Sequence, residues 1–325
     1  MPEAPLVDQM ARLGDRGLLA PTAFATRGDE LDAVRAVAAR GIGAGRVFDG
    51  HRNALERLLV HRPADLPDDF HVAVARGDHL LGVWGADPGA GDGSPAVLAE
   101  DGRSVTGVKT FCSGAGVVDH AIVLVRRTAD GPPTLPVVID LRDPDAVRID
   151  RAWFTSLALA ESHSHRVEFE RAPVVAVLGT EGTLSEEPWI SGDALRSTAV
   201  WAGAAETLLA RMLAASGGGP AADERVGRAA AIVQGAWVWL GAGLDAVLEE
   251  HEGGAASWPT VAAMRLELTE RLRDLLRLAA EHGGSRGLVH DTPLHEARDG
   301  LDLLLLQHRL APTATRLGAH ARGAR

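Results

Sequence analysis

The last third of the chain places the strongest constraint on the fold, because it carries long stretches of helical periodicity that end at glycines. The clearest runs from Pro259 to His282, where leucines recur three and four residues apart. A proline at its start and a glycine pair after its end are the expected boundaries of a helix. Three other stretches have the same character: 192–216, 222–251 and 292–321. Four long helices joined by glycine-containing loops predict an antiparallel four-helix bundle.

The middle of the chain has a different hydrophobic period. Between residues 78 and 185, short apolar or alternating runs are separated by Gly, Asp and Pro, which is the pattern of β-strands with tight turns. The Asp101–Gly102 pair predicts a hairpin between Val97 and Val105. Because no helical stretch interrupts these strands, we expect an antiparallel sandwich or barrel.

The first 77 residues return to helical spacing. One stretch starts near residue 29 and is expected to stop at the glycines around residue 43, and a second covers 51–62 and ends at Pro63. We therefore predict an α+β fold with three domains. These are N-terminal helices (1–77), a central antiparallel β-barrel or sandwich (78–185) and a C-terminal four-helix bundle (186–325).

The composition excludes several functions. A formal net charge of −11 disfavours binding to nucleic-acid phosphates. Cys112 is the only cysteine, so neither an internal disulfide nor a cysteine-based metal site is expected. His163 and His165 alternate on one predicted strand, where exposed histidines are a better interpretation than metal ligands. Because we find no signal peptide and no run of about 20 apolar residues, we expect a cytoplasmic protein that binds neither nucleic acid nor a membrane.

Four segments of the chain carry a family resemblance. Val83–Pro95 reads VWGADPGAGDGSP, and Gly107–Val125 reads GVKTFCSGAGVVDHAIVLV. Two later features follow in order: HSHRVEFERAPVVAVLG at 163–179, and Gly283–Gly284 followed by Arg298–Asp299. Together they resemble the acyl-CoA dehydrogenase family over roughly residues 80–325. The resemblance implies an FAD-dependent enzyme that oxidises the Cα–Cβ bond of an acyl thioester or related substrate. It also implies a homodimer or homotetramer, and it allows an electron-transfer flavoprotein as the partner that accepts the electrons.

The resemblance also implies which residues lie at the flavin. Phe111 takes the place of the aromatic residue that packs against the flavin ring, and Ser113 that of the hydroxyl that bonds the reactive ring nitrogen. Alternation along a strand would point both side chains to one face and Cys112 into the β-core. In the first motif Trp84 is the aromatic residue, whereas Ala86 replaces the threonine that bonds the flavin carbonyls.

Arginines of the last third are candidates for binding the FAD pyrophosphate. The resemblance points to Arg225 or Arg228, and Arg286 could substitute for a missing glutamine before the glycine pair. The alternative for all three is a solvated position at a helix end. The tryptophans of this region fit the core or a subunit interface better than a cofactor contact: Trp201, Trp237 and Trp239.

Two departures from the family bear on the reaction. Asp92 stands where the family has a serine associated with acyl-CoA binding, and a carboxylate there would repel the anionic end of CoA. A polar turn residue is the alternative for this substrate-binding position. Gln307 stands where the family has its catalytic glutamate, and an amide cannot accept a proton at neutral pH.

Three functions therefore stay open. Dehydrogenation would need another base, and two glutamates of the last third have instead the spacing of surface ion pairs: Glu267 with Arg271, and Glu270 with Arg273. His308, if not a surface histidine, favours a flavin monooxygenase on the same fold. In such enzymes reduced flavin reacts with O₂ to give a peroxide, which a histidine could protonate or hold. The third function is that of a non-catalytic scaffold or one subunit of a hetero-oligomer.

Overall fold

The computed structural model describes residues 5–215, 218–290, 292–307 and 310–323. Contacts within the chain group it into two compact units. The β-unit comprises Met1–Thr26, Arg46–Ser156 and Ala160–Trp189. The helical unit comprises Arg27–Gly45, Leu157–Leu159 and Ile190–Arg325. The N-terminal helices are thus divided between the two units, and they do not group together as a unit of their own.

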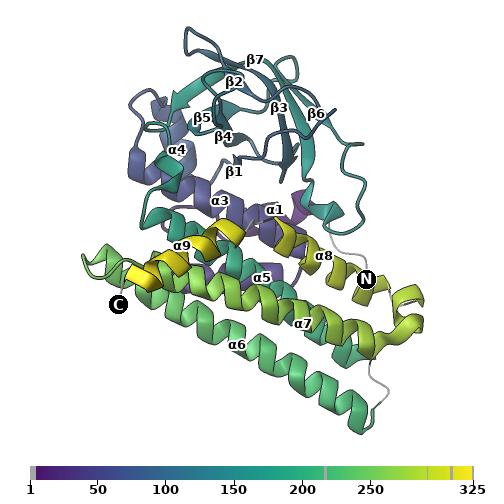
Figure 1. The fold of residues 1–325 in the computed structure, drawn as a ribbon. Helices are drawn as coiled ribbons and strands as arrows, with labels where there is room; N and C mark the ends of the chain where they lie inside the picture. The colour runs from purple at the N-terminus through teal and green to yellow at the C-terminus, as the bar shows by residue number, and fades with distance from the viewer. Residues whose placement is uncertain (1–4, 216–217, 291, 308–309, 324–325) are drawn as a thin grey trace. The chain divides into compact units, whose positions relative to one another are not determined.

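The β-unit contains a seven-stranded sheet with the order β1-β4-β5-β7-β3-β2, and β6 pairs with β7 (Figure 1). The strands are β1 (Leu81–Trp84), β2 (Val97–Leu98), β3 (Ser104–Cys112), β4 (His120–Val125), β5 (Leu135–Asp140), β6 (Val147–Asp150) and β7 (His165–Val177). The pairs are antiparallel except β1 with β4, which is parallel and departs from the expected pattern.

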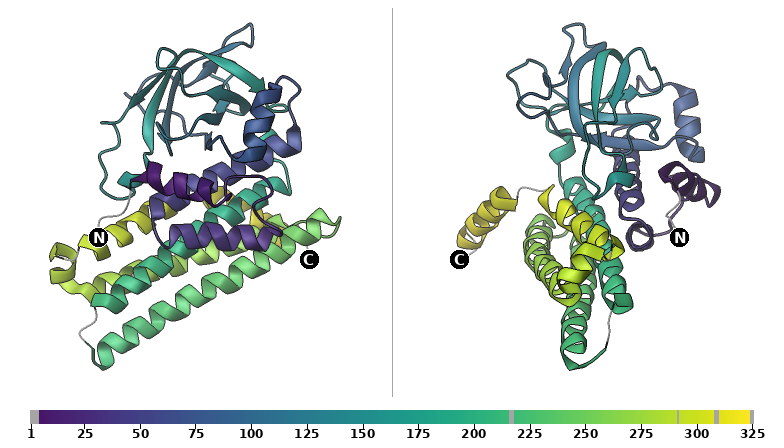
Figure 2. Two further views of the ribbon diagram at one scale, coloured as in Figure 1. Left: turned by 180° about the vertical axis from the view of Figure 1, so that it is seen from behind. Right: turned by 90° about the vertical axis from the view of Figure 1, so that its right-hand side faces the viewer.

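The long strand β7 connects the two parts of the sheet. Its first part pairs with β3 and β6, and Val174 begins the part that pairs with β5. Arg171 lies before this change with a φ of 53°, in the left-handed region. Strand β2 is also joined to the residue that follows β4, because Leu98 N donates to Arg126 O at 2.9 Å and Arg126 N donates to Ala96 O at 3.0 Å. The sheet is therefore closed in the manner of a barrel, and Figure 2 shows its curvature.

The predicted hairpin is present, and it opens the segment that becomes the site. Val97 pairs with Thr106 and Leu98 with Val105, and Gly102 supplies a φ of 71° in the turn. Gly107 has a φ of 123°, and a side chain there would collide with the carbonyl of Pro95. Only glycine allows this close approach of the two motif segments.

Helices pack against the sheet within the β-unit. They are α4 (Asp68–Arg76) and the larger part of α3 (Ile42–His61), and the unit also contains α1 (Leu6–Asp15). The core between them and the sheet is made of buried apolar residues: Ala54, Leu55, Leu58, Leu66, Phe70, Val74, Leu81, Ile122, Val138, Ala176, Leu178 and Leu184. Helix α3 begins well before the predicted residue 51 and runs through the glycines that were expected to end a helix. A side chain at Gly45 would collide with Ala38, so this glycine permits close packing of helices.

The helical unit confirms the predicted bundle, with two differences in its helix ends. Its helices are α2 (Arg27–Ala38), α5 (Trp189–Ala215), α6 (Pro220–His251), α7 (Trp258–His290), α8 (Thr292–Leu306) and α9 (Leu310–Gly323). Helices α6 and α7 lie alongside each other over most of their length (Figures 1 and 2). At the glycine pair the helical conformation is broken at Gly284 (φ 58°, ψ −168°), and the last predicted helix is divided into α8 and α9.

Helix α6 is more apolar than the sequence analysis recognised. An 18-residue window of α6 has a mean hydropathy of 1.4, and 28% of that window is buried. By length and composition alone this helix could cross a membrane, although core helices of soluble proteins can have the same length and composition. The expectation that no segment could do so missed α6, because Gln234 and Asp245 interrupt its apolar stretch and leave no continuous run of about 20 apolar residues.

Candidate functional site

The second motif ends in irregular backbone at the end of β3. Phe111 has a φ of 52°, which a phenylalanine rarely adopts, and the register with β7 shifts between Lys109 and Cys112. Phe111 is 48% exposed and Cys112 is fully buried, as predicted. Regular alternation does not explain this, because Lys109 and Thr110 are both buried. A local irregularity of the bulge type directs Phe111 outward. Burial raises the pKa of the Cys112 thiol, so this cysteine is a core residue beside the site.

Phe111 belongs to a cluster of aromatic rings that the sequence analysis missed. Its ring meets Trp153 edge to face with 4.9 Å between centroids, and Phe154 at 6.5 Å. The Trp153 indole donates to Asp92 Oδ1 at 3.0 Å, and Arg166 Nε donates to the Asp92 carbonyl at 2.7 Å. Asp92 therefore holds its turn and presents a fixed carboxylate next to the aromatic cluster. In a chain with 4% aromatic content, the adjacent aromatic residues Trp153 and Phe154 were the feature from which this cluster could have been predicted.

Trp84 and Ala86 connect the first motif to the second. Trp84 is 2% exposed, and its Nε1 donates to the Ser113 carbonyl at 3.0 Å. The Ala86 carbonyl accepts a hydrogen bond from Thr110 N at 3.0 Å. Both residues thus position the backbone that carries Phe111 and Ser113, and a contact of either with a cofactor stays a prediction.

A buried ion group, formed by Asp87, Lys109 and Arg126, anchors the start of the first motif. Lys109 has no exposed surface, and its Nζ donates to Asp87 Oδ1 at 2.7 Å and to the Gly85 carbonyl at 3.2 Å. Arg126 donates to Asp87 Oδ2 from Nε at 3.0 Å and from Nη2 at 2.7 Å. Burial lowers the pKa of Lys109, and the hydrogen bond to Asp87 opposes that shift. The only lysine of the chain is therefore part of the support of the site.

Three serine hydroxyls form a chain beside the end of β3. Ser113 Oγ lies 2.9 Å from Ser164 Oγ, which lies 2.7 Å from Ser162 Oγ. Ser162 and Ser164 are buried, and His163 between them has a φ of 48°. Burial, followed by the charge of Arg151, lowers the pKa of His163. The motif analysis missed both inner serines because they come from a distant segment of the chain.

The two histidines of that segment do not form a metal site within the described structure. The rings of His163 and His165 lie 5.5 Å apart, and burial is the main cause that lowers the pKa of each. Across the residues that the structure describes, no group of three or more His, Cys, Asp or Glu could hold a metal ion. The expected exposure of these histidines is wrong for His165, which is 8% exposed.

The helical unit carries the predicted arginines. Arg228 Nε lies 2.6 Å from Glu224 Oε1 in a pair that is mostly exposed, and Arg286 is also exposed. Arg225 is half-buried, and its buried Nε has no hydrogen-bond partner among the described residues. Of the three, Arg225 is therefore the best candidate for binding an anion.

The same unit carries the residues considered as catalytic bases. Gln307 lies exposed in the turn after α8, and His308 lies outside the described residues. The alternative glutamates are surface partners, as predicted: Glu267 with Arg271 at 2.8 Å, and Glu270 with Arg273 at 2.6 Å. Neither glutamate is available as an unpaired base.

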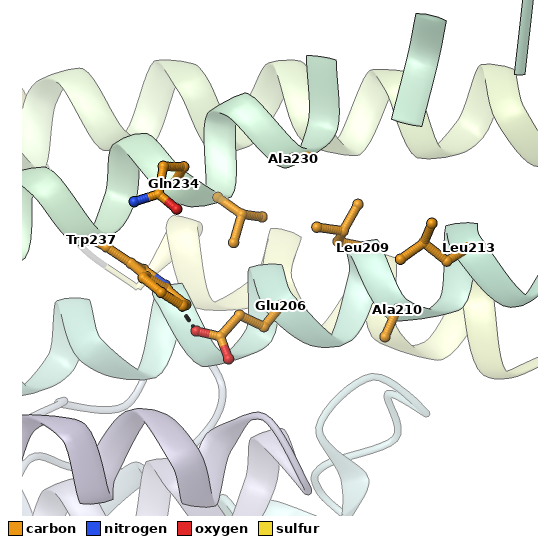
Figure 3. A pocket seen from close by; sticks show the side chains of 8 residues that line it. Glu206, Leu209, Ala210, Leu213, Ala230, Gln234 and Trp237 are labelled. Atoms are coloured by element: carbon orange, nitrogen blue, oxygen red, sulfur yellow. Dashed lines mark hydrogen bonds between the residues drawn. The ribbon is translucent and has the colours of Figure 1, made fainter. Parts of the chain in front are cut away.

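A cavity of about 330 Å³ lies between α5 and α6 (Figure 3). Apolar residues form most of its wall: Leu209, Ala210, Leu213, Ala230 and Val233. At one end Trp237 Nε1 donates to Glu206 Oε1 at 2.9 Å, and Arg35 pairs with that carboxylate at 2.6 Å and stacks over the Trp237 ring at 4.7 Å. None of the predicted cofactor residues lines this cavity. Trp201 is buried, Trp239 is partly buried and Trp237 is 43% exposed, which agrees with core and surface positions.

The residues at the end of β3 fit a flavin in their chemistry. A flavin needs an apolar surface for its ring system and hydrogen-bonding groups at its polar ring atoms. The half-exposed ring of Phe111 supplies the first, and the partly exposed hydroxyl of Ser113 supplies the second. Buried neighbours hold Ser113 in place: Trp84 bonds its carbonyl and Ser164 its hydroxyl. The rings of Trp153 and Phe154 pack against Phe111.

Solved structures resemble the whole chain. The dibenzothiophene monooxygenase TdsC from Paenibacillus sp. A11-2, in complex with FMN and indole, aligns with a TM-score of 0.76 at 18% identity, over 97% of this chain and 90% of that one. Butyryl-CoA dehydrogenase from Megasphaera elsdenii gives 0.75 at 15% identity, over 97% and 89%. The chain has the acyl-CoA dehydrogenase fold. PigA with FAD and proline aligns with a TM-score of 0.76 at 14% identity, over 97% and 89%.

Sequence comparisons add little to this result. No protein-family model matches the chain. The dihydroxy-acid dehydratase of Acidothermus cellulolyticus is 33% identical over 111 residues, which are 33% of this chain. The match spans only 18% of the length of that relative, so it carries no statement about the activity of this chain.

Proposed function

We propose that this chain is a flavin-dependent oxidoreductase. The observation that carries the proposal is the end of β3 in a chain of this fold. There the half-exposed Phe111 is followed two residues later by Ser113, whose hydroxyl lies 2.9 Å from that of Ser164. A bound flavin supplies the capacity to accept two electrons from a substrate. Phe111 would provide the apolar surface for the flavin, Ser113 a hydrogen bond at its edge, and Trp84 would fix the backbone of Ser113.

The flavin is proposed to be FAD. The pyrophosphate of FAD requires a cationic group, and of the three candidate arginines Arg225 is the one whose buried Nε has no hydrogen-bond partner among the described residues. The alternatives Arg228 and Arg286 are exposed, and Arg228 is paired with Glu224. Chromatography of the flavin released by heat would distinguish FAD from FMN.

The reaction follows from the residues that stand in place of the usual base and substrate contact. Oxidation of the Cα–Cβ bond of an acyl thioester requires a group that removes the α-proton, and the amide of Gln307 cannot do so. Asp92, fixed by Trp153 at 3.0 Å, would also repel the phosphates of CoA. Dehydrogenation is therefore proposed for a related substrate with an acidic α-proton or with a base of its own. A flavin monooxygenase is the second candidate, and Gln307 and Asp92 favour it.

The visible spectrum of the purified protein tests the proposal directly. A flavin band near ~450 nm is expected, because bound oxidised flavin keeps its own absorbance. A colourless protein that FAD does not reconstitute would contradict the proposal and favour a scaffold or a hetero-oligomer subunit. Anaerobic bleaching of the oxidised flavin by a panel of acyl thioesters would support dehydrogenation. If no thioester bleaches the flavin and the chemically reduced protein consumes oxygen rapidly, monooxygenation would be supported.

The chain is further proposed to form homodimers or homotetramers in the cytoplasm. Support comes from α6, which leaves large apolar side chains exposed: Trp237 (43%), Val238 (66%) and Leu248 (42%). Burying this surface against a second copy would stabilise the assembly by the hydrophobic effect. Sedimentation that shows only monomer would contradict this. An electron-transfer flavoprotein is the proposed partner if the reaction is a dehydrogenation.

A further inference from the structure

The serine chain beside Phe111 has a property that no single hydroxyl has. Ser164 Oγ lies within hydrogen-bond distance of both Ser113 Oγ (2.9 Å) and Ser162 Oγ (2.7 Å), and either atom of each pair could be the donor. A hydroxyl has one proton to donate and can accept from its neighbours. Ser164 is only 4% exposed, so its hydroxyl has to donate to one of the two neighbouring serines to avoid being an unsatisfied buried donor.

Two arrangements use that proton. In the outward arrangement Ser162 donates to Ser164, Ser164 donates to Ser113, and Ser113 is left to donate to a ligand. In the inward arrangement Ser113 donates to Ser164, Ser164 donates to Ser162, and Ser113 can only accept from a ligand. The hydroxyls need only rotate to change from one arrangement to the other, and no proton passes between residues.

The backbone holds the three oxygens at these distances. Gly114 N donates to the Ser162 carbonyl at 2.8 Å, and Ala115 N donates to the His163 carbonyl at 3.1 Å. His165 N also donates to the His163 carbonyl at 2.9 Å, which closes a tight turn around Ser164. The segment that carries the inner serines is therefore fastened to the segment that carries Ser113, and the spacing of the hydroxyls does not depend on a ligand.

We propose that this chain of hydroxyls reverses its direction with the oxidation state of the bound flavin, and that Ser162 and Ser164 are positioning residues for Ser113. The inference rests on the proposed function. The reactive ring nitrogen of oxidised flavin is a hydrogen-bond acceptor, and in reduced flavin it carries a proton and is a donor. The outward arrangement suits the first state and the inward arrangement the second, so Ser113 can bond the same nitrogen in both.

The consequence of removing Ser164 differs between the two states. Oxidised flavin would still receive the proton of Ser113. With reduced flavin, Ser113 would accept from the flavin and its own proton would have no acceptor, which is the costlier defect for a donor that the bound flavin shields from water. Ser164→Ala should therefore weaken binding of reduced flavin about tenfold relative to oxidised flavin. A tenfold change in this ratio corresponds to a midpoint potential about 30 mV lower for a two-electron couple.

The test compares midpoint potentials of the flavin-loaded full chain, by titration with a redox dye, in a small set of variants. Ser164→Ala should lower the potential, and Ser164→Thr should restore it because the hydroxyl returns. Ser162→Ala should also lower it, because the proton of the buried Ser164 then has no acceptor in the inward arrangement. Ser104→Ala, at the other end of the same strand, is the matched control and should keep the wild-type potential. Adding Ser164→Ala to Ser113→Ala should change nothing further, because the effect acts through Ser113.

The outcomes separate this inference from the proposed function. A potential of Ser164→Ala equal to that of the wild type, or an equal shift with and without Ser113, would overturn the role of the hydroxyl chain while flavin binding stands. A wild-type chain that binds no flavin would overturn both. Flavin binding titrations in each oxidation state give the same ratio independently of any enzymatic activity.

Discussion

Replacing Asp87 by asparagine would remove the negative charge of the buried ion group without changing its size. Lys109 is 0% exposed and Asp87 16%, so little water can replace the lost carboxylate. Removing one partner of a buried ion pair costs about 3–5 kcal/mol. Arg126 is 21% exposed and can be partly hydrated, and Lys109 keeps its hydrogen bond to the Gly85 carbonyl. We therefore expect a loss near the lower limit, about 3 kcal/mol.

The single lysine of the chain makes this loss measurable at one site. An amine-acetylating reagent can reach Lys109 Nζ only when the surrounding structure opens, so its rate of acetylation reports the free energy of that opening. Mass spectrometry of the peptide that contains residue 109 gives the rate. A loss of about 3 kcal/mol predicts an acceleration of about a hundredfold in Asp87→Asn.

The matched control changes a carboxylate to an amide on the surface. Glu181 pairs with Arg127 at 2.6 Å, but the two side chains are 48% and 60% exposed. Such pairs contribute about 1 kcal/mol or less, so Glu181→Gln should change the acetylation of Lys109 by no more than about fivefold. If Asp87→Asn accelerated acetylation no more than this control, the ion group would not be what holds the first motif in place.

Three further predictions concern other groups of the chain. Burial lowers the pKa of His120 to about 4. Because the imidazole of the unfolded chain takes up its proton near pH 6.5, the free energy of unfolding should fall by about 3 kcal/mol between pH 6.5 and 4. Urea titrations should show a flatter pH dependence for His120→Gln than for the wild type. Cys112, fully buried with a raised pKa, should react with a thiol reagent only after denaturation. Arg225→Ala should weaken FAD binding about tenfold in fluorescence titrations and leave FMN binding unchanged. Arg228→Ala removes a guanidinium already paired with Glu224, so it should affect the binding of neither flavin. Equal effects of the two substitutions would exclude Arg225 as the pyrophosphate ligand.

Periodicity was sufficient to predict the bundle and the hairpin, because both depend on patterns within one segment. Helix α2 ends at Ala38, just before the glycines that were expected to stop it, but Gly43 and Gly45 also lie inside the start of α3, where no helix was predicted. Glycine ends a helix when the chain turns away, and it continues a helix when another backbone must come close, as Gly45 does against Ala38. A glycine that ends a helix and a glycine that allows close packing inside a helix cannot be told apart in the sequence. The parallel pairing of β1 with β4 was also hidden, because strand patterns do not record the direction of the neighbouring strand.

The site shows the same division between local and distant information. The motif pointed to Phe111 and Ser113, yet the outward direction of Phe111 comes from a φ of 52° that no alternation rule predicts. Ser113 and Ser164 are 51 positions apart, and their hydroxyls meet only because two backbone hydrogen bonds fasten their segments. A sequence motif identifies the group that would touch the flavin, whereas the groups that set its direction of donation are identified only in three dimensions. Residue 164 lies outside both motifs at the flavin, Val83–Pro95 and Gly107–Val125. A substitution there is therefore expected to change how Ser113 bonds the flavin.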